Sequence, residues 1–476
     1  MIPPVLLPSS ADPLIAIRVL FHAGSVHDPR GKEGLAALTV AMISEGGSKR
    51  LTYAELLDAL YPLAAGIGAR ADKEVSILCG CVHRDNLYTY YDLFRQILIE
   101  PRFDPADFER LKSDQLNYLT RILRATDDEN LGKEVLGAAM YEGHPYGRPT
   151  AGTVRGIRSI ALDDVKAFYA THFSARHCEL GLAGGYPVEF VDRVRGDLEG
   201  PKESRRRAVY LPAHRMPRGI EVTLVTKPAR AWAISIGYPL DITRKDDDFY
   251  PLMLANSHLG EHRTFNGVLM KKMRSERGLN YGDYSYIENF IQEGGSTFPL
   301  ANVLRRQQFF SIWIRPVAAG NAHFAIRQAM SELARLVRDG MSVEELETTR
   351  GFLLNYSRLW TQTAERRLGY RMDGSFYGGG SLVDEVHSRL PNLTLDQVNR
   401  AIRKHLQAEN AYVAVVADEQ GASTFVQALR SNAPSPVHYA TETRPEVLEE
   451  DKRVAIYPLE VNSDRLWIHR AEELFE

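Results

Sequence analysis

The feature that most constrains this chain is that it contains the same sequence pattern twice. Residues 161–173 (ALDDVKAFYATHF) match residues 394–406 (TLDQVNRAIRKHL), and residues 106–118 match residues 343–356 at nearly the same offset. Identical pairs include Leu162 with Leu395, Asp163 with Asp396, Val165 with Val398, His172 with His405, Glu109 with Glu347, Asn117 with Asn355 and Tyr118 with Tyr356. A duplication of more than 200 residues predicts two homologous domains, because a repeated unit of this size can bury a core of its own.

Each copy shows the same order of predicted elements. An alternating strand (LIAIRVLFHAGS; AWAISIGYPL) is followed by a short apolar helix, then by further strands and long amphipathic helices. Strands and helices mix without strict alternation, so we expect an α+β fold with antiparallel-rich sheets packed against helices. The predicted boundaries are 1–200 for the first domain, 201–218 for a linker, 219–435 for the second domain and 436–476 for a C-terminal extension.

The composition argues against several classes of function. The 476 residues have a formal net charge of −3, with no domain-wide basic excess that would favour nucleic acid. The basic run Arg205–Arg207 in the linker is interpreted as a solvated tether. Three scattered cysteines, Cys79, Cys81 and Cys178, do not make a disulfide framework.

No targeting or membrane segment is recognisable. None of the apolar runs reaches the ~18–20 residues needed to cross a bilayer. The stretch MIPPVLLPSSADPL lacks a basic segment followed by a sustained apolar one. As written, the sequence predicts a cytoplasmic protein, and a longer start with an export signal would make it periplasmic.

Three motifs in a fixed order make the chain similar to a known family. They are RVLFHAGSVHDPRGKEGLAALT (18–39), HPYGRPTAGTVRGIRSIALDDVKAFYATHF (144–173) and MRSERGLNYG (273–282). The chain resembles the pitrilysin/insulinase-type (M16) peptidases, and more narrowly the short bacterial two-domain branch that works as dimers. The resemblance implies a LuxS/MPP-like metallohydrolase fold, a clamshell arrangement of the two domains, and peptides as substrates.

The zinc motif of that family is missing from this chain. Active members carry His-x-x-Glu-His on the first helix, where two His bind Zn²⁺ and the Glu polarises the bound water. In this sequence the first His falls on Ala37, the Glu on Val40 and the second His on Ala41. The third ligand, a Glu, is expected within 114–125, where the only acid is Asp114. The resemblance therefore implies no cofactor in this chain and a zinc ion in a partner subunit.

The second copy offers a different family feature, an Arg and a Tyr seven residues apart. The stretch MRSERGLNYGDY places Arg274 and Tyr281 in the family's R-x-x-x-x-G-L-x-Y context. There the guanidinium is expected to contact a substrate carbonyl, and the phenol to donate to the oxyanion of the intermediate. Arg277 and Tyr284 have the same spacing. The adjacent GLNY favours Arg274 and Tyr281 as the catalytic contacts.

An inverted zinc motif is also spelled in the second copy. The stretch HLGEH contains His258, Glu261 and His262 as an alternative metal site. Two points argue against it: the family places the end of a helix here, and Gly260 is a poor residue inside a helix. We expect these His residues to lie at a loop end or on the surface.

The leading hypothesis is a non-catalytic subunit of a heterodimeric M16-type peptidase. A zinc-bearing homologue would supply the metal, and this chain would supply Arg274 and Tyr281 for peptide hydrolysis. The alternatives are an autonomous zinc peptidase that uses residues 258–262, and a non-enzymatic peptide-binding or scaffold protein of the same fold. Co-assembly as a heterodimer or as a homodimer is left open.

Overall fold

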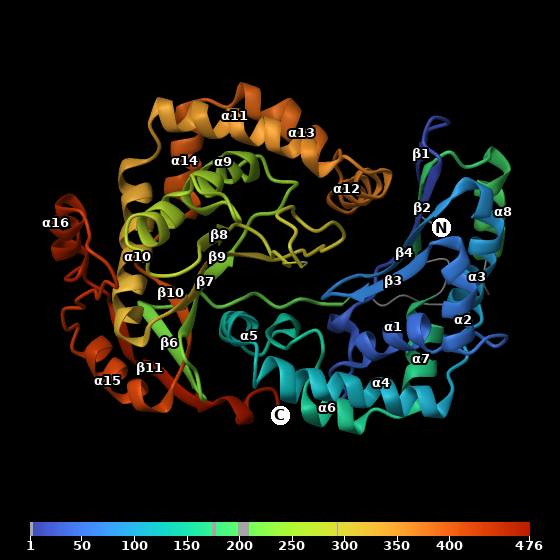
Figure 1. Ribbon diagram of the computed structural model, residues 1–476, viewed down its shortest axis with the longest axis horizontal. Helices are drawn as coiled ribbons and strands as arrows, with labels where there is room; N and C mark the ends of the chain where they lie inside the picture. The colour runs from blue at the N-terminus through green and yellow to red at the C-terminus, as the bar shows by residue number, and fades with distance from the viewer. Residues whose placement is uncertain (1–2, 174–177, 199–208, 293) are drawn as a thin grey trace.

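Two β-sheets, each covered by helices, form the two halves of the molecule (Figure 1). The computed structural model describes residues 3–173, 178–198, 209–292 and 294–476. The basic run Arg205–Arg207 of the predicted linker lies outside these residues. The strands of the first sheet are β1 (Val5–Pro8), β2 (Leu14–Phe21), β3 (Gly66–Ala71), β4 (Ser76–His83) and β5 (Cys178–Gly184). Those of the second are β6 (Ile220–Thr226), β7 (Trp232–Leu240), β8 (Asp283–Tyr286), β9 (Gln308–Val317), β10 (Ala411–Ala417) and β11 (Val461–Arg470).

Helices account for most of the remaining chain. Those of the first half are α1 (Leu35–Glu45), α2 (Tyr53–Leu60), α3 (Leu87–Ile99), α4 (Pro105–Asn117), α5 (Asp128–Met140), α6 (Val154–Ser159), α7 (Leu162–His172) and α8 (Val188–Leu198). Those of the second half are α9 (Phe249–Gly260), α10 (Ala322–Asp339), α11 (Val343–Trp360), α12 (Ala364–Tyr377), α13 (Leu382–Arg389), α14 (Leu395–His405), α15 (Glu419–Arg430) and α16 (Pro445–Val454).

The strand order confirms that the two halves share one fold. The first sheet has the order β1-β5-β2-β4-β3, and the second has the corresponding order β6-β10-β7-β9-β8 with β11 added beside β6. In each sheet one matching pair is parallel, β1 with β5 and β6 with β10. Apart from β11, which is parallel to β6, the other pairs of named strands are antiparallel. The predicted α+β class with antiparallel-rich sheets is confirmed.

The two halves exchange one helix each. Helix α5 of the first copy packs on β7 and β10 of the second sheet, and α12 of the second copy packs on β1, β2 and β5 of the first. In Figure 1 both helices lie between the sheets. Leu131 and Leu136 of α5 join a core with Val416, while Leu368 and Met372 of α12 join another with residues of the first sheet. Burial of these faces couples the stability of each domain to the other.

Ion pairs add polar contacts between the halves. Asp72 and Glu74, in the short turn between β3 and β4, contact Arg305 at 3.0 Å and Arg306 at 2.5 Å. Lys227 of the second half pairs with Asp128 at the start of α5. The side chains of Asp72 and Arg305 are both buried, so removal of either one would leave an unpaired charge in the interface.

The C-terminal extension is an integral part of the second half. Strand β11 pairs with β6, and α16 packs against α10. The last residues then reach the first half, where Arg124 contacts the carbonyl of Leu474 and the carboxylate of Glu476. The extension therefore covers one edge of the second sheet and ties the two copies together.

Candidate functional site

Helix α1 holds the positions that correspond to the zinc motif. It begins after Gly34, whose φ of 105° is a left-handed conformation that favours glycine. The carboxylate of Asp28 accepts hydrogen bonds from the backbone N–H groups of Gly34 and Ala36 at 2.8 and 2.7 Å. These bonds satisfy two of the free N–H groups at the start of the helix, although burial raises the pKa of Asp28 to about 7.

The side chains of α1 at the motif positions cannot bind a metal. Val40 is buried in the first core, and Ala37 and Ala41 are half-buried beside it. Methyl and isopropyl groups have no lone pair to donate, so zinc does not fit this helix. The helix ends at the C-cap residue Gly46, and its role here is packing.

The segment expected to hold a third ligand also has a structural role. Asp114 is exposed on α4, with its nearest cation, Arg110, at 3.9 Å. The Gln115 amide donates to the carbonyls of Gly34 at 2.9 Å and Ala151 at 2.7 Å, which joins α4 to the start of α1. Across the described parts of the chain, His, Cys, Asp and Glu side chains form no group of three or more that could hold a metal ion.

Arg274 and Tyr281 lie on either side of a tight turn in the second copy. Arg274 is near the end of the π-helical turn η7 (Met270–Ser275), and Tyr281 immediately precedes Gly282 and β8. Asn280 fixes this loop because its amide donates to Asp283 at 2.7 Å and to the carbonyl of Arg315 at 3.0 Å. The loop backbone is thus held firmly while the Tyr281 side chain is 77% exposed.

The polar groups of this pair are available to an external molecule. The Arg274 guanidinium is half-buried over the ring of Phe265, at 4.9 Å from its centroid. Within the described residues it has no ion pair, and the Tyr281 hydroxyl has no hydrogen-bond partner. Phe265, which sequence reasoning missed, is itself 64% exposed. In the sequence, Phe265 is marked only by its position three residues after the HLGEH motif.

The competing pair with the same spacing is buried. The Arg277 side chain is inaccessible and contacts Asp451 at 2.8 Å and Glu450 at 3.1 Å on α16. Tyr284 on β8 is only 3% exposed. Arg277 therefore serves to hold the C-terminal extension, and of the two pairs only Arg274 and Tyr281 reach solvent.

The HLGEH residues point to different neighbours. Helix α9 ends at Gly260, as expected. A side chain does not fit at this position, because a Cβ would lie 2.7 Å from the backbone nitrogen of Ser285. His258 lies before this end and faces Glu345 at 3.6 Å. His262 lies beyond it, and its Nδ1 is 2.6 Å from the Tyr286 hydroxyl.

The environment of His262 corrects one expectation. The residue is at a loop end, but its side chain is not on the surface: it is 1% exposed and packs against Tyr284, Tyr286 and Phe290. Burial lowers the pKa of His262 to about 3, and burial raises the pKa of Glu261 to about 7. The two imidazoles of the motif are thus not presented from one helical turn, which a shared zinc ion would require.

Comparison with known proteins identifies relatives over most of the chain. The model of the insulinase domain (peptidase family M16) matches residues 5–154, and that of the peptidase M16 inactive domain matches residues 159–353. The chain is 20% identical over 413 residues to the non-peptidase homolog YmxG of Helicobacter pylori, with 86% of this chain and 90% of that protein covered.

Two further proteins are similar over comparable lengths. An uncharacterized zinc protease of Mycobacterium tuberculosis is 21% identical over 382 residues, covering 79% of this chain and 82% of that protein. The crystal structure of a peptidase M16 inactive domain from Pseudomonas fluorescens superposes with a TM-score of 0.75 at 23% identity. That match covers 87% of this chain and 95% of the other.

Sequence, fold and site agree on one assignment. The duplicated halves match the two M16 domain models in order, and α1 has no donor atom at any position of the zinc motif. In the part of the chain that the structure describes, no helix is both long and apolar enough to cross a membrane. The chain therefore belongs to the M16 (insulinase-type) peptidase family and fits its non-catalytic members.

Proposed function

We propose that this chain is the non-catalytic subunit of a heterodimeric M16-type peptidase. A zinc-bearing homologue supplies the metal site, and Arg274 and Tyr281 of this chain act on the peptide held there. The observation that supports this most strongly is the contrast between the two copies. The first has no donor atoms at the zinc positions of α1, whereas the second presents an Arg without an ion pair and a Tyr hydroxyl without a hydrogen bond among the described residues.

The two side chains suit the polarisation of a peptide carbonyl. A guanidinium presents several N–H donors in a fixed plane and can bind a carbonyl oxygen, while a phenol donates a single O–H. Directed at the oxygen that becomes negative when the peptide bond is attacked, such donors are worth about 3–4 kcal/mol each. The rigid loop at Asn280 would reduce the entropy lost when Tyr281 takes up this position.

The sheets also offer a general way to hold an unfolded peptide. Strands β3 and β8 end their sheets, so one side of each backbone pairs with no described strand. An extended peptide can add to such an edge through main-chain hydrogen bonds, which depend little on its sequence. This mode is the one we propose for peptide substrates of the assembled pair.

The test is reconstitution with a zinc-bearing homologue encoded beside this chain. We expect the pair to cleave a fluorogenic peptide, and we expect Arg274→Ala and Tyr281→Phe each to lower kcat by about 10²–10³. Assembly, measured by size-exclusion chromatography with light scattering, should be unchanged. Matched surface controls are Arg358→Ala and Tyr61→Phe, whose side chains are exposed elsewhere.

The outcomes distinguish the proposed catalytic role from the non-enzymatic alternative. Unchanged turnover in both site variants would show that Arg274 and Tyr281 have no catalytic contact. A stable homodimer that confers no activity on any zinc-bearing homologue would instead support the peptide-binding or scaffold alternative.

A further inference from the structure

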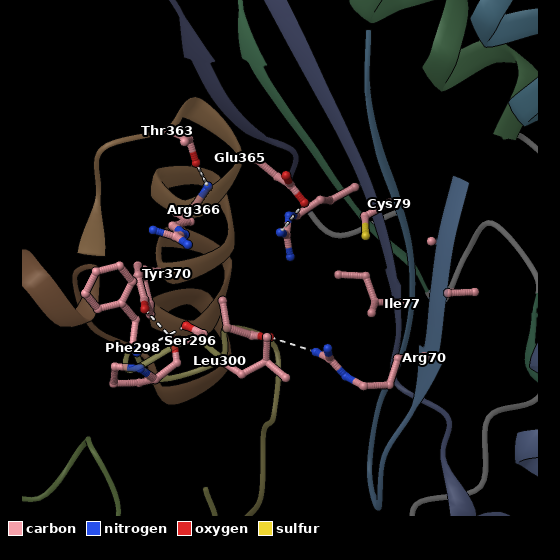
Figure 2. Close-up of a pocket in the computed structure, with 15 residues that line it drawn as sticks. Arg70, Ile77, Cys79, Ser296, Phe298, Leu300, Thr363, Glu365, Arg366 and Tyr370 are labelled. Carbon is pink, nitrogen blue, oxygen red and sulfur yellow. Dashed lines mark hydrogen bonds and ion pairs between the residues drawn. The ribbon is translucent and has the colours of Figure 1, made fainter. Parts of the chain in front are cut away.

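The inner face of the first sheet is only partly covered. Helix α12 packs on β1, β2 and β5, and a pocket of about 430 Å³ remains over β4 and β3. The register places Gly68 of β3 beside Cys79 of β4, so small residues form part of its floor. The segment 296–301 and the first turn of α12 form the opposite wall, as Figure 2 shows.

The pocket has an excess of positive charge. Among the described residues, three guanidinium groups line it, from Arg18, Arg70 and Arg366, and one carboxylate, from Glu365. In Figure 2, Arg70 projects from the sheet side while Glu365 and Arg366 project from α12. Clustered like charges in a partly enclosed space favour an anionic occupant, because the low-dielectric walls weaken screening by water.

Each Arg is held in place by neighbouring groups. Arg18 contacts Glu365 at 3.0 Å and the Asn302 side chain at 2.5 Å, and Arg70 donates to the carbonyl of Ala301 at 2.8 Å. The Arg366 guanidinium lies 4.7 Å from the centroid of the Phe298 ring.

Arg18 provides an independent sign that a ligand belongs here. Its side chain is 10% exposed, and its Nε is buried without a hydrogen-bond partner in the described structure. An unpaired buried donor is unfavourable, and a carboxylate oxygen in the pocket would satisfy it. The pocket also lies beside the free edge of β3, where an extended backbone can pair.

We propose that this pocket binds the carboxylate of an extended peptide whose backbone lies along β3. The carboxylate comes from the C-terminus of the peptide or from an acidic side chain, since both present the same two oxygens to the guanidinium groups. The inference rests on the proposed peptide-binding function and adds a preference for acidic over neutral peptides.

The first test measures binding to the isolated chain, so it does not depend on a zinc-bearing partner. Fluorescence anisotropy is recorded with N-terminally labelled hexapeptides in four forms. These are a neutral peptide with a free C-terminus, the same peptide amidated, and amidated versions with one Glu or one Gln. We expect at least about tenfold tighter binding of the free acid, of the Glu peptide, or of both, relative to the amidated Gln peptide.

The four arms also identify the source of the carboxylate. Preference for the free acid alone assigns the pocket to a peptide C-terminus, and preference for the Glu peptide alone assigns it to an acidic side chain. Equal affinity for all four peptides, or no binding of any, would overturn the proposal. Loss of partner-dependent hydrolysis with retained acidic preference would overturn only the proposed catalytic function.

The second test changes the pocket. Arg366→Gln and Arg70→Gln should each weaken binding of the preferred peptide about tenfold, whereas Arg371→Gln, an exposed position on the same helix, should leave it unchanged. Gly68→Leu should fill the pocket, since a Cβ there meets Cys79 Sγ at an ordinary 3.5 Å. Gly196→Leu on α8, where a Cβ meets nothing within 4 Å, is the control. Normal binding by Gly68→Leu and Arg366→Gln would contradict the assigned site.

Discussion

Residues directly opposite one another on neighbouring strands form a row across each sheet. Equivalent rows of the two copies carry different kinds of side chain. Strand register aligns the row Arg18, Cys79 and Gly68 in the first sheet with the row Ser235, Trp313 and Tyr284 in the second. Small residues in the first row leave a charged pocket, whereas aromatic rings in the second pack with Tyr286 and Met270 into a cluster. One backbone architecture therefore supports an open, charged pocket in one half and a closed aromatic cluster in the other.

The two copies also differ in the reactive side chains that they present. In the first copy the helix α1 contributes only packing groups, while in the second copy the loop between η7 and β8 presents Arg274 and Tyr281 to solvent. A shared fold does not fix activity, which depends on the side chains at particular positions. Duplication has left each copy with a different part of the function that we propose.

The largest expected difference is in the free energy of unfolding, between substitutions at equivalent positions of the two rows. Trp313→Ala should lower the free energy of unfolding by about 3–5 kcal/mol, because Trp313 is 7% exposed and lies under Lys133 at 3.6 Å. Cys79→Ala, at the equivalent position beside the pocket, should lower it by less than about 1 kcal/mol. Chemical denaturation of both variants measures the difference. Equal losses would show that the first row is as tightly packed as the second.

The second prediction concerns how the stability of the second copy depends on pH. Burial raises the pKa of Asp283 on β8 to about 8, so the folded state binds a proton that the unfolded chain releases near pH 4. This contribution to stability is present at low pH and is lost as the pH rises toward 8, by at most about 1.4 kcal/mol per pH unit.

The variant Asp283→Asn isolates that effect. It keeps an oxygen for the hydrogen bond from Asn280 but cannot ionise. Relative to Asp283→Asn, the wild-type chain should lose stability between pH 5 and pH 8 in urea titrations. Asp163→Asn, at a side chain that is 94% exposed, is the control and should follow the wild type. Parallel curves for Asp283→Asn and the wild type would refute the raised pKa.

A smaller effect on the free energy of unfolding is expected from changes at the C-terminus. The second sheet is closed by β11, and the residues after it are held by Arg124 of the first copy, whose side chain is 7% exposed. Arg124→Ala should cost about 1–2 kcal/mol of unfolding free energy. Deletion of residues 474–476 should cost a similar amount, and the two changes together should be less than additive because both remove the contacts of Arg124 with Leu474 and Glu476. Full additivity would mean that the terminal residues and Arg124 act independently.

Much of the fold could be predicted from the sequence because its signals are local or repeated. The duplicated segments predicted two similar domains, and the glycines at the ends of α1 and α9 marked where these helices stop. Hydrophobic periodicity indicates that a helix buries one face, but it does not say which sheet covers that face. The exchange of α5 and α12 between the halves was therefore missed.

The site was only partly predictable for a similar reason. The substitutions at Ala37, Val40 and Ala41 could be read directly, because the loss of a donor atom needs no knowledge of packing. The burial of His262 and Arg277, by contrast, depends on segments distant in the sequence. The pocket beside Arg18 combines three separate stretches of the chain, and none of them carries a recognisable motif.

The most direct test of the account is the activity of the purified chain alone. Zinc content is measured together with cleavage of a fluorogenic peptide, for the wild type and for His258→Ala. We predict less than stoichiometric zinc, no chelator-sensitive cleavage, and no difference between the two proteins, with cleavage appearing only when a zinc-bearing homologue is added. One tightly bound zinc per chain, with cleavage that chelator abolishes and His258→Ala removes, would contradict it.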